Sequence, residues 1–313
     1  MIQKIGEALV SQAVNLKAQD IYIIPYKKQY KVFMRIGDER RFIDNYEMKQ
    51  MASLISHFKF VAGMNVGEKR RCQLGACDYK VTLSESIPLR LSSVGNFRGF
   101  ESLVIRLLTT VNKPLNYWFD TDQKVEKVIS GRGLYLFSGP VGSGKTTLMY
   151  QLLTHIAKDK QVITIEDPVE IQEDSLLQIQ VNESIGMTYD NLIKLSLRHR
   201  PDYLIIGEIR DVETAKAVIR ASLTGAIVFS TVHAKSIPGV YKRLLELGIK
   251  REEINHTLKF IAYQRLIAGG GLIDFAIETF ETHSNQEWNQ KLDHLLAKGH
   301  ITQQQALSEK ISD

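Results

Sequence analysis

Residues 139–146 read Gly-Pro-Val-Gly-Ser-Gly-Lys-Thr, the complete G-x-x-x-x-G-K-[ST] pattern of a phosphate-binding loop. The glycines let the backbone curl so that several N–H groups point at one anion, and the next helix adds its positive N-terminal end. Lys145 is placed to reach the β and γ phosphates, and the Thr146 hydroxyl to hold Mg²⁺, which prefers oxygen ligands. The pattern therefore predicts binding of a nucleoside triphosphate. The residues predicted to bind it are Gly139, Pro140, Val141, Gly142, Ser143, Gly144, Lys145, Thr146 and Thr147.

Acidic side chains follow two apolar runs downstream of this loop. Glu208 comes directly after the run 203–207, and we predict that it orients or deprotonates the attacking water. Glu166, Asp167 and Glu170 follow a second run, where they are placed to bind Mg²⁺ or aim the water. A capped turn at a strand end is the alternative for either cluster alone. Together with the loop, the two clusters favour a hydrolase.

A histidine follows a third apolar run, 226–231. Thr231 and His233 lie two residues apart on a predicted strand, so their side chains project to the same side. His233 could sense the γ phosphate or couple hydrolysis to movement, whereas a lone histidine is more often structural.

Short apolar strands alternate with helices from about residue 118 onward, which predicts an α/β domain with a parallel sheet. In such sheets ligands lie at the carboxyl ends of the strands, so the polar residues described above should converge on the nucleotide. A glycine-rich turn without a ligand is the alternative for the loop, but a strand before it and a helix after it favour the nucleotide site. The strands are expected at 134–138, 162–166, 203–207 and 226–231.

The chain before this domain has a different pattern. Residues 1–110 predict a small α+β domain, and residues 111–118 a linker with a proline. Residues 119–283 form the predicted ATPase domain, and residues 284–313 a tail of two short polar helices that packs loosely on the core or on a partner. In the first domain we expect helices at 1–18 and 46–62 and strands at 21–24, 30–34, 78–83, 88–94 and 102–108.

Composition excludes several classes of protein. The 313 residues have no run of 18 apolar residues and no signal-peptide pattern, so neither secretion nor membrane spanning is expected. Two cysteines, Cys72 and Cys77, are too few for a disulfide framework or a four-thiolate zinc site, so we expect free thiols in a reducing cytoplasm.

Charge is distributed unevenly along the chain. Residues 1–110 contain 17 Lys and Arg against 10 Asp and Glu, a net charge of +7 within a total of +5. This excess could face an acidic partner, a neighbouring subunit's nucleotide or anionic lipid, or it could be an ordinary solvated face.

Four segments in order resemble the signatures of the secretion ATPase superfamily, which powers type II secretion, type IV pili and competence pseudopili. They are the loop 139–146, the acidic segment 166–170, the segment 207–211 and the histidine segment 223–233. The short chain without a four-cysteine element is most similar to the competence-pilus assembly ATPases of Gram-positive bacteria. The segment Arg71-Cys-Gln-Leu-Gly-Ala-Cys77 departs from the family pattern, which leaves the role of that loop open.

The resemblance implies a RecA-like P-loop domain preceded by a PAS-like domain that contributes arginines. Arg90 and Arg106 lie in the matching segments and are candidates to compensate γ-phosphate charge. The implied cofactors are ATP and Mg²⁺, without zinc. The implied assembly is a homo-hexamer at the cytoplasmic face of the membrane, acting on a polytopic platform protein and indirectly on pilin-like subunits, without direct DNA binding.

Three alternatives stay open at this point. A retraction motor or a type IV secretion ring ATPase shares nearly all of these features. A DNA-translocating or helicase-like ATPase is suggested by the basic charge, although the basic residues occur as scattered pairs and triplets in the sequence. A nucleotide-binding scaffold without catalysis is the third, and the intact Glu208 argues against it.

Overall fold

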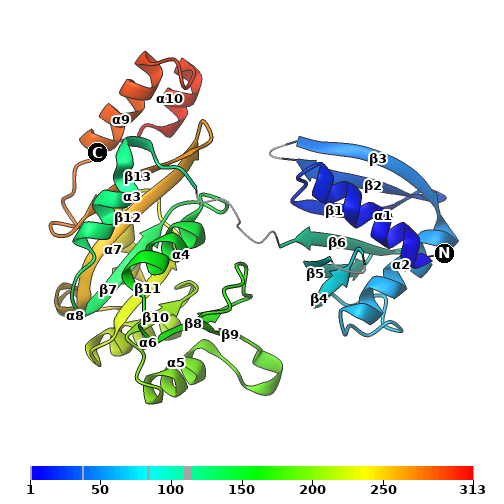
Figure 1. The fold of residues 1–313 in the computed structure, drawn as a ribbon, viewed down its shortest axis with the longest axis horizontal. Helices are drawn as coiled ribbons and strands as arrows, with labels where there is room; N and C mark the ends of the chain where they lie inside the picture. The colour runs from blue at the N-terminus through cyan, green and yellow to red at the C-terminus, as the bar shows by residue number, and fades with distance from the viewer. Residues whose placement is uncertain (1, 37–38, 83–84, 109–114, 313) are drawn as a thin grey trace. The chain divides into compact units, whose positions relative to one another are not determined.

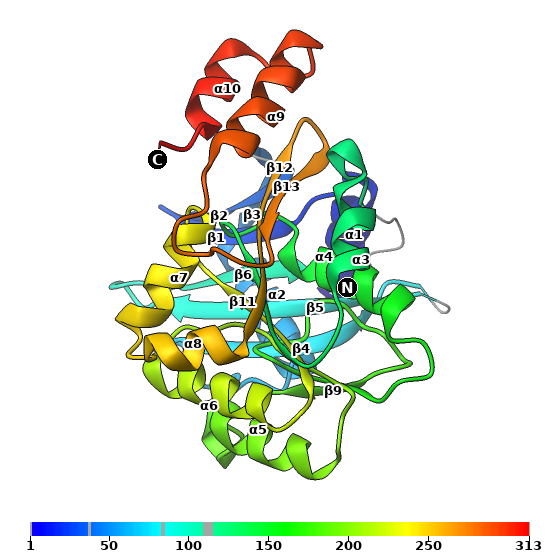
Figure 2. The same ribbon diagram turned by 90° about the vertical axis from the view of Figure 1, so that its left-hand side faces the viewer.

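The computed structural model describes residues 2–36, 39–82, 85–108 and 115–312. Contacts between α-carbons divide the chain into two units, Met1–Thr110 and Val111–Asp313. Each unit contains one β-sheet with its own helices (Figures 1 and 2). The first half of the expected linker, residues 111–114, lies outside the described residues.

The N-terminal unit is one antiparallel sheet of six strands with two helices, and its strand order is β3-β2-β1-β6-β5-β4. Its elements are α1 (Ile2–Asn15), β1 (Asp20–Tyr26), β2 (Gln29–Ile36), β3 (Glu39–Glu47), α2 (Met48–Val61), β4 (Gln73–Lys80), β5 (Ser86–Gly95) and β6 (Glu101–Leu107). Both helices lie against one face of the sheet, where alternate strand residues such as Ile21, Ile23, Leu89 and Ile105 are buried with Phe58 of α2. Arg90 and Arg106 lie on the other face of the sheet.

Two details of this unit differ from the sequence prediction. Strand β3 was not predicted, because seven of its nine residues are exposed and it therefore lacks a hydrophobic alternation. Strand β4 begins at Gln73, so most of the segment 71–77 is strand rather than loop. Cys72 and Cys77 are free thiols, as expected.

The second unit is a seven-stranded sheet in the order β13-β12-β7-β11-β10-β8-β9. All neighbouring strands are parallel except the pair β12 and β13. Its strands are β7 (Gly133–Ser138), β8 (Val162–Glu166), β9 (Leu177–Gln180), β10 (Tyr203–Ile206), β11 (Ile227–Val232), β12 (Leu258–Ile267) and β13 (Gly270–Ala276). Its helices are η1 (Trp118–Asp120), α3 (Thr121–Val128), α4 (Lys145–Ile156), η2 (Glu183–Ile185), α5 (Tyr189–Arg198), α6 (Val212–Leu223), α7 (Ile237–Glu246), α8 (Arg251–Thr257), α9 (Gln286–Ala297) and α10 (Gln303–Glu309).

Helices cover both faces of this sheet, which explains the continuous apolar strands. Leu134 and Leu136 of β7 point to one face and pack with residues of α5 to α10, whereas Tyr135 and Phe137 point to the other and pack with α3 and α4. The four predicted strands are present. Strands β9, β12 and β13 were not predicted, and β12 turns out to be the parallel neighbour of β7.

The C-terminal tail packs tightly, and the expectation of loose packing was wrong. Trp288 of α9 is completely buried, its Nε1 donates to the Glu309 carbonyl at 2.8 Å, and its ring centroid lies 5.1 Å from that of Tyr263. The tail therefore extends the same core as the sheet. Its residues in that core are Trp288, Leu292, Leu295, Ile301 and Ala306.

We expect Trp288→Ala to lower the free energy of unfolding by about 3–5 kcal/mol, because it removes a large buried side chain and leaves a cavity. Leu307→Ala, at a residue that is 65% exposed on α10, is the matched control and should cost less than about 1 kcal/mol. Urea unfolding followed by circular dichroism measures both. Equal effects of the two variants would contradict the tight packing of the tail.

Candidate functional site

The phosphate-binding loop connects β7 to α4, and α4 begins at Lys145. Gly139 and Gly144 adopt φ angles of 143° and 84°, a region that favours glycine. A Cβ on Gly139 would come within 2.2 Å of the Gln264 carbonyl oxygen, and one on Gly144 within 2.9 Å of the Gln264 side-chain nitrogen. Glycine at these two positions is thus required both by the backbone conformation and by a close neighbour.

Lys145 lies inside the loop and is only 8% exposed. Its Nζ donates to the carbonyl oxygens of Gly139 at 3.0 Å and Pro140 at 2.9 Å. Burial lowers the pKa of Lys145, and the carboxylates of Glu208 and Glu170 act in the opposite direction. The ammonium group is therefore held at the loop with acidic side chains close enough to affect it.

Glu208 and His233 meet beside this loop. His233 Nε2 lies 3.4 Å from a Glu208 carboxylate oxygen, and its Nδ1 lies 3.1 Å from the Gly139 carbonyl oxygen. The Thr231 hydroxyl donates to the Gly207 carbonyl at 2.7 Å, which fastens β11 to the segment that carries Glu208. The carboxyl ends of β7, β10 and β11 thus bring a lysine, a glutamate and a histidine together, as parallel sheets do.

Arg210 adds a cation to this group. Its guanidinium forms an ion pair with Glu208 and lies 3.5 Å from Asp167, so it joins the ends of β10 and β8. These contacts raise the pKa of Arg210, chiefly through the hydrogen bond to Glu208. The sequence placed Arg210 next to Glu208 but did not indicate that it pairs with the acidic segment.

Glu166 occupies a different position from Glu208. It is 4% exposed, and one carboxylate oxygen accepts hydrogen bonds from Tyr150 at 2.7 Å, Thr164 at 2.6 Å and Gln178 at 3.4 Å. Burial raises the pKa of Glu166, and these three donors lower it by a smaller amount. Glu166 therefore ties α4 to β8 and β9 at the edge of the loop.

The predicted magnesium ligands supply oxygen atoms of the kind that Mg²⁺ binds. The Thr146 hydroxyl lies in the first turn of α4, and Asp167 and Glu170 are exposed carboxylates after β8. Within the described ranges no three His, Cys, Asp or Glu side chains form a metal-binding group by themselves. Thr146 and one carboxylate could hold the ion together with phosphate oxygens, and the absence of zinc stays a prediction.

Arg90 and Arg106 lie directly opposite each other on β5 and β6. The register continues this row with Asp20 opposite Arg106, Arg35 opposite Asp20 and Arg40 opposite Arg35. Arg106 Nε donates to Asp20 at 2.8 Å, and this carboxylate is 4% exposed. The row lies on the sheet face opposite the helices, because the strand neighbours of Arg90 and Arg106 are buried against α1 and α2. These five residues form the arginine row, which carries a net positive charge. Its members are Arg90, Arg106, Asp20, Arg35 and Arg40.

Residues 1–291 match the family described as "Type II/IV secretion system protein". The chain belongs to this family. It is similar to the "Competence protein ComGA" of Streptococcus pneumoniae (strain ATCC BAA-255 / R6), with 58% identity over 312 residues that cover 100% of this chain and 99% of that relative. It is also 38% identical to the "Competence protein ComGA" of Bacillus subtilis (strain 168) over 85% of this chain and 76% of that relative. The resemblance to secretion ATPases is confirmed.

Two solved structures share the fold. The pilus retraction motor PilT with bound ADP superposes with a TM-score of 0.73 at 22% identity, covering 98% of this chain and 97% of that one. The Legionella pneumophila ATPase DotB gives a TM-score of 0.72 at 17% identity, covering 94% and 92%. The expected α/β fold with a P-loop domain is thereby confirmed.

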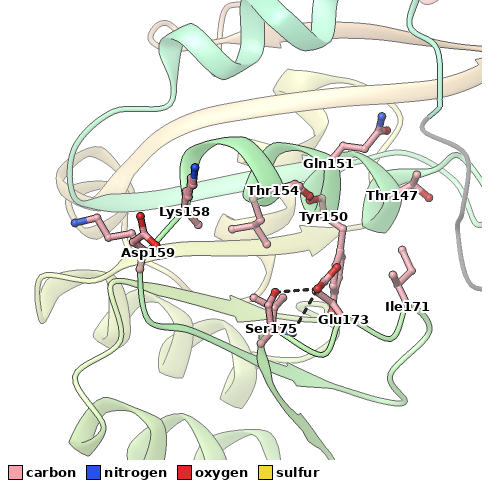
Figure 3. A pocket seen from close by; sticks show the side chains of 13 residues that line it. Thr147, Tyr150, Gln151, Thr154, Lys158, Asp159, Ile171, Glu173 and Ser175 are labelled. Atoms are coloured by element: carbon pink, nitrogen blue, oxygen red, sulfur yellow. Dashed lines mark hydrogen bonds between the residues drawn. The ribbon is translucent and has the colours of Figure 1, made fainter.

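A cavity of about 540 Å³ lies beside α4 and is lined by α4, by the turn after it and by residues 171–176 (Figure 3). Of the predicted nucleotide-binding residues only Thr147 lines it, and Lys145 and Glu208 do not. At its rim, the backbone N–H and the hydroxyl of Ser175 both donate to the Glu173 carboxylate and close the turn before β9 (Figure 3). We assign no step of hydrolysis to this cavity.

Sequence reasoning missed two residues at the candidate sites, Gln264 and Asp20. Each is a polar side chain that is at most 3% exposed, and each contacts a predicted site residue or loop. Gln264 and Arg265 together interrupt an apolar run, with Phe260–Tyr263 before them and Leu266–Ile267 after them, and this interruption is the signal that could have drawn attention to Gln264. For Asp20 only the strand register reveals the contact.

Proposed function

We propose that this chain is the ATP-hydrolysing motor that powers assembly of a competence pseudopilus, a filament related to type IV pili. The proposed ATPase activity is supported by one observation, the convergence of Lys145, Glu208 and His233 on the phosphate-binding loop. The role in competence is supported by similarity to the "Competence protein ComGA" over the full length of the chain.

In this proposal each residue has a distinct role. The loop amides and Lys145 bind the phosphates, and Glu208 accepts a proton from the attacking water. Arg210 holds the Glu208 carboxylate in place, and His233 links that carboxylate to the loop backbone at Gly139. His233 contacts both Glu208 and the Gly139 carbonyl. A movement of the loop on phosphate release would therefore shift His233 and change its contact with Glu208.

Mg²⁺ would be held by the Thr146 hydroxyl with Asp167 or Glu170 acting directly or through water. When bound, the ion supplies positive charge to the phosphate oxygens. Glu166 keeps α4 and β8 together through Tyr150, so that these ligands stay in reach of the loop.

Arg90 and Arg106 compensate charge on the γ phosphate in this proposal, in the manner of arginine fingers. We expect Arg90→Ala and Arg106→Ala each to lower ATP turnover by at least about 100-fold while the oligomer is retained. Phosphate release and size-exclusion chromatography measure the two properties. Arg98→Ala, in the turn between β5 and β6, is the matched control and should keep the parental rate. Unchanged turnover in both test variants would remove the arginine role.

The proposed assembly is a homo-hexamer whose motion is transmitted to a polytopic membrane platform and from there to pilin-like subunits. The proposed domains are 1–110 and 119–283, joined by the linker 111–118, with the helical tail 284–313 after the second domain. The proposed location is cytoplasmic at the membrane face. In the described part of the chain, no helix has the length and apolar character that a membrane span requires.

The proposed role is tested in cells. Deletion of the gene should abolish pseudopilus assembly and DNA uptake, and the parental gene should restore both, whereas the Lys145→Ala gene should not. Excess filaments in the deletion strain would instead indicate a retraction motor.

The arginine row supports a second candidate function, DNA binding. It gathers basic residues that are scattered in the sequence, and the Arg40 guanidinium lies 4.0 Å from the centre of the Phe33 ring. A salt-dependent affinity for single-stranded DNA that stimulates ATP turnover would support a DNA-translocating ATPase instead.

A further inference from the structure

Gln264 contacts the phosphate-binding loop from a strand that lies more than one hundred residues away in the sequence. Strand β12 is the parallel neighbour of β7, and the register pairs Tyr263 with Ser138, so Gln264 follows beside Gly139. Its side chain is 1% exposed, and its Nε2 donates to the Ser143 carbonyl oxygen at 2.8 Å. Its Oε1 is buried, and it has no hydrogen-bond partner among the residues that the structure describes.

This hydrogen bond fixes one peptide plane of the loop. In a trans peptide the C=O and the next N–H point in opposite directions. The Ser143 carbonyl faces Gln264, so the Gly144 N–H faces away from Gln264. An inward-pointing N–H at this position is what a phosphate-binding loop needs.

Strand β12 is held from its other side by the C-terminal tail. Tyr263 packs on Trp288, and Arg265 forms an ion pair with Glu309 of α10. Because side chains alternate along a strand, these neighbours of Gln264 point away from the loop and leave its carboxamide at the loop. The contacts of Tyr263 and Arg265 with the tail, together with the hydrogen bond to Ser143, thus fix the position of the Gln264 carboxamide.

We propose that Gln264 is a positioning residue for the nucleotide: it orients the Ser143–Gly144 peptide so that its N–H is available to a phosphate oxygen. This inference rests on the proposed ATPase function and adds a residue outside the loop motif. It also explains why glycine is needed at position 144, because the Gln264 side chain occupies the space beside Gly144.

The test compares three variants of the full-length chain. Gln264→Met keeps the length of the side chain but cannot donate, and Gln264→Glu places an acceptor against the carbonyl. We expect Gln264→Met to raise the Kd for ATP about 10-fold with kcat changed less than about threefold, because one hydrogen bond that shapes the ground-state site is lost. Gln264→Glu should raise the Kd further.

Gln151→Met is the matched control. Gln151 lies within α4, accepts from the Tyr117 hydroxyl at 2.8 Å and donates to the Leu115 carbonyl at 3.2 Å. Gln151→Met therefore removes a carboxamide from α4 but leaves the hydrogen bond from Gln264 to Ser143 in place. Its Kd for ATP should stay within about twofold of the parental value. Fluorescence titration with a labelled ATP analogue gives Kd, and thermal unfolding without nucleotide shows whether each variant is folded.

Two results would overturn the inference. One is a parental Kd in Gln264→Met, the variant that cannot donate a hydrogen bond to the Ser143 carbonyl. The other is a Kd raised equally in Gln151→Met and Gln264→Met. If the parental chain itself fails to bind ATP, the proposed function fails rather than the role of Gln264. If Gln264→Met does not fold, Gln264→Glu and Gln264→Asn decide by the same comparison of Kd.

Discussion

Replacement of Lys145 by alanine should abolish ATP turnover, with a loss of at least about 1,000-fold, and should weaken ATP binding. The side chain is buried in the loop, and in the proposed function its ammonium is the cation that the loop itself supplies to the phosphates. Alanine removes this charge at a place where burial makes it effective, because charges interact more strongly away from water. Phosphate release and titration with a labelled ATP analogue measure the two effects.

Lys158→Ala is the control for Lys145→Ala. Lys158 is an exposed lysine directly after α4, so it has the same charge and lies near the same helix without reaching the loop. It should keep turnover within about twofold of the parental rate. Normal turnover in Lys145→Ala would mean that the loop does not bind the phosphates, and the proposed function would fail with it.

Glu208→Gln should leave ATP binding intact and lower hydrolysis by about 100- to 10,000-fold. The amide keeps the size of the side chain but cannot accept the proton of the attacking water. It also weakens the ion pair with Arg210 and the contact with His233. The expected signature is therefore a chain that traps ATP, observed as a normal Kd for ATP together with lost phosphate release.

A comparison of Glu208→Gln with Glu166→Gln decides which acid acts as the base. Glu213→Gln, at an exposed residue in the first turn of α6, is the matched control and should hydrolyse ATP at the parental rate. Glu166→Gln tests the buried alternative. A parental rate in Glu208→Gln together with a lost rate in Glu166→Gln would transfer the role of base to Glu166.

Much of the ATPase site could be predicted from the sequence because its requirements are local. The loop needs glycines before Lys145, a strand before it and a helix after it, and all of these are neighbours along the chain. The acids Glu208 and Glu166 and the residue His233 could be assigned because each follows a short apolar strand, and the ends of parallel strands meet at one edge of the sheet.

Other contacts could not be predicted from the sequence, since they depend on strand order and on packing. Strand β12 lies beside β7 although 119 residues separate Ser138, the end of β7, from Leu258, the start of β12. Only this neighbourhood brings Gln264 to the loop. Asp20 reaches Arg106 across a strand pair whose partners are 86 residues apart. The tail was predicted to pack loosely because its helices are polar overall, whereas Trp288 inserts fully into the core.

The residue types and their order along the chain predict the chemistry of the loop and of the acids and histidine at the strand ends, and they carry the resemblance to the secretion ATPase superfamily. The packing of the strands shows which side chains contact these residues: Gln264 at the loop, Arg210 between two acids, and Asp20 within the arginine row. The physical reason is that backbone conformation is encoded by neighbouring residues, whereas a hydrogen bond between distant residues forms only where the packing of strands places donor and acceptor within about 3 Å.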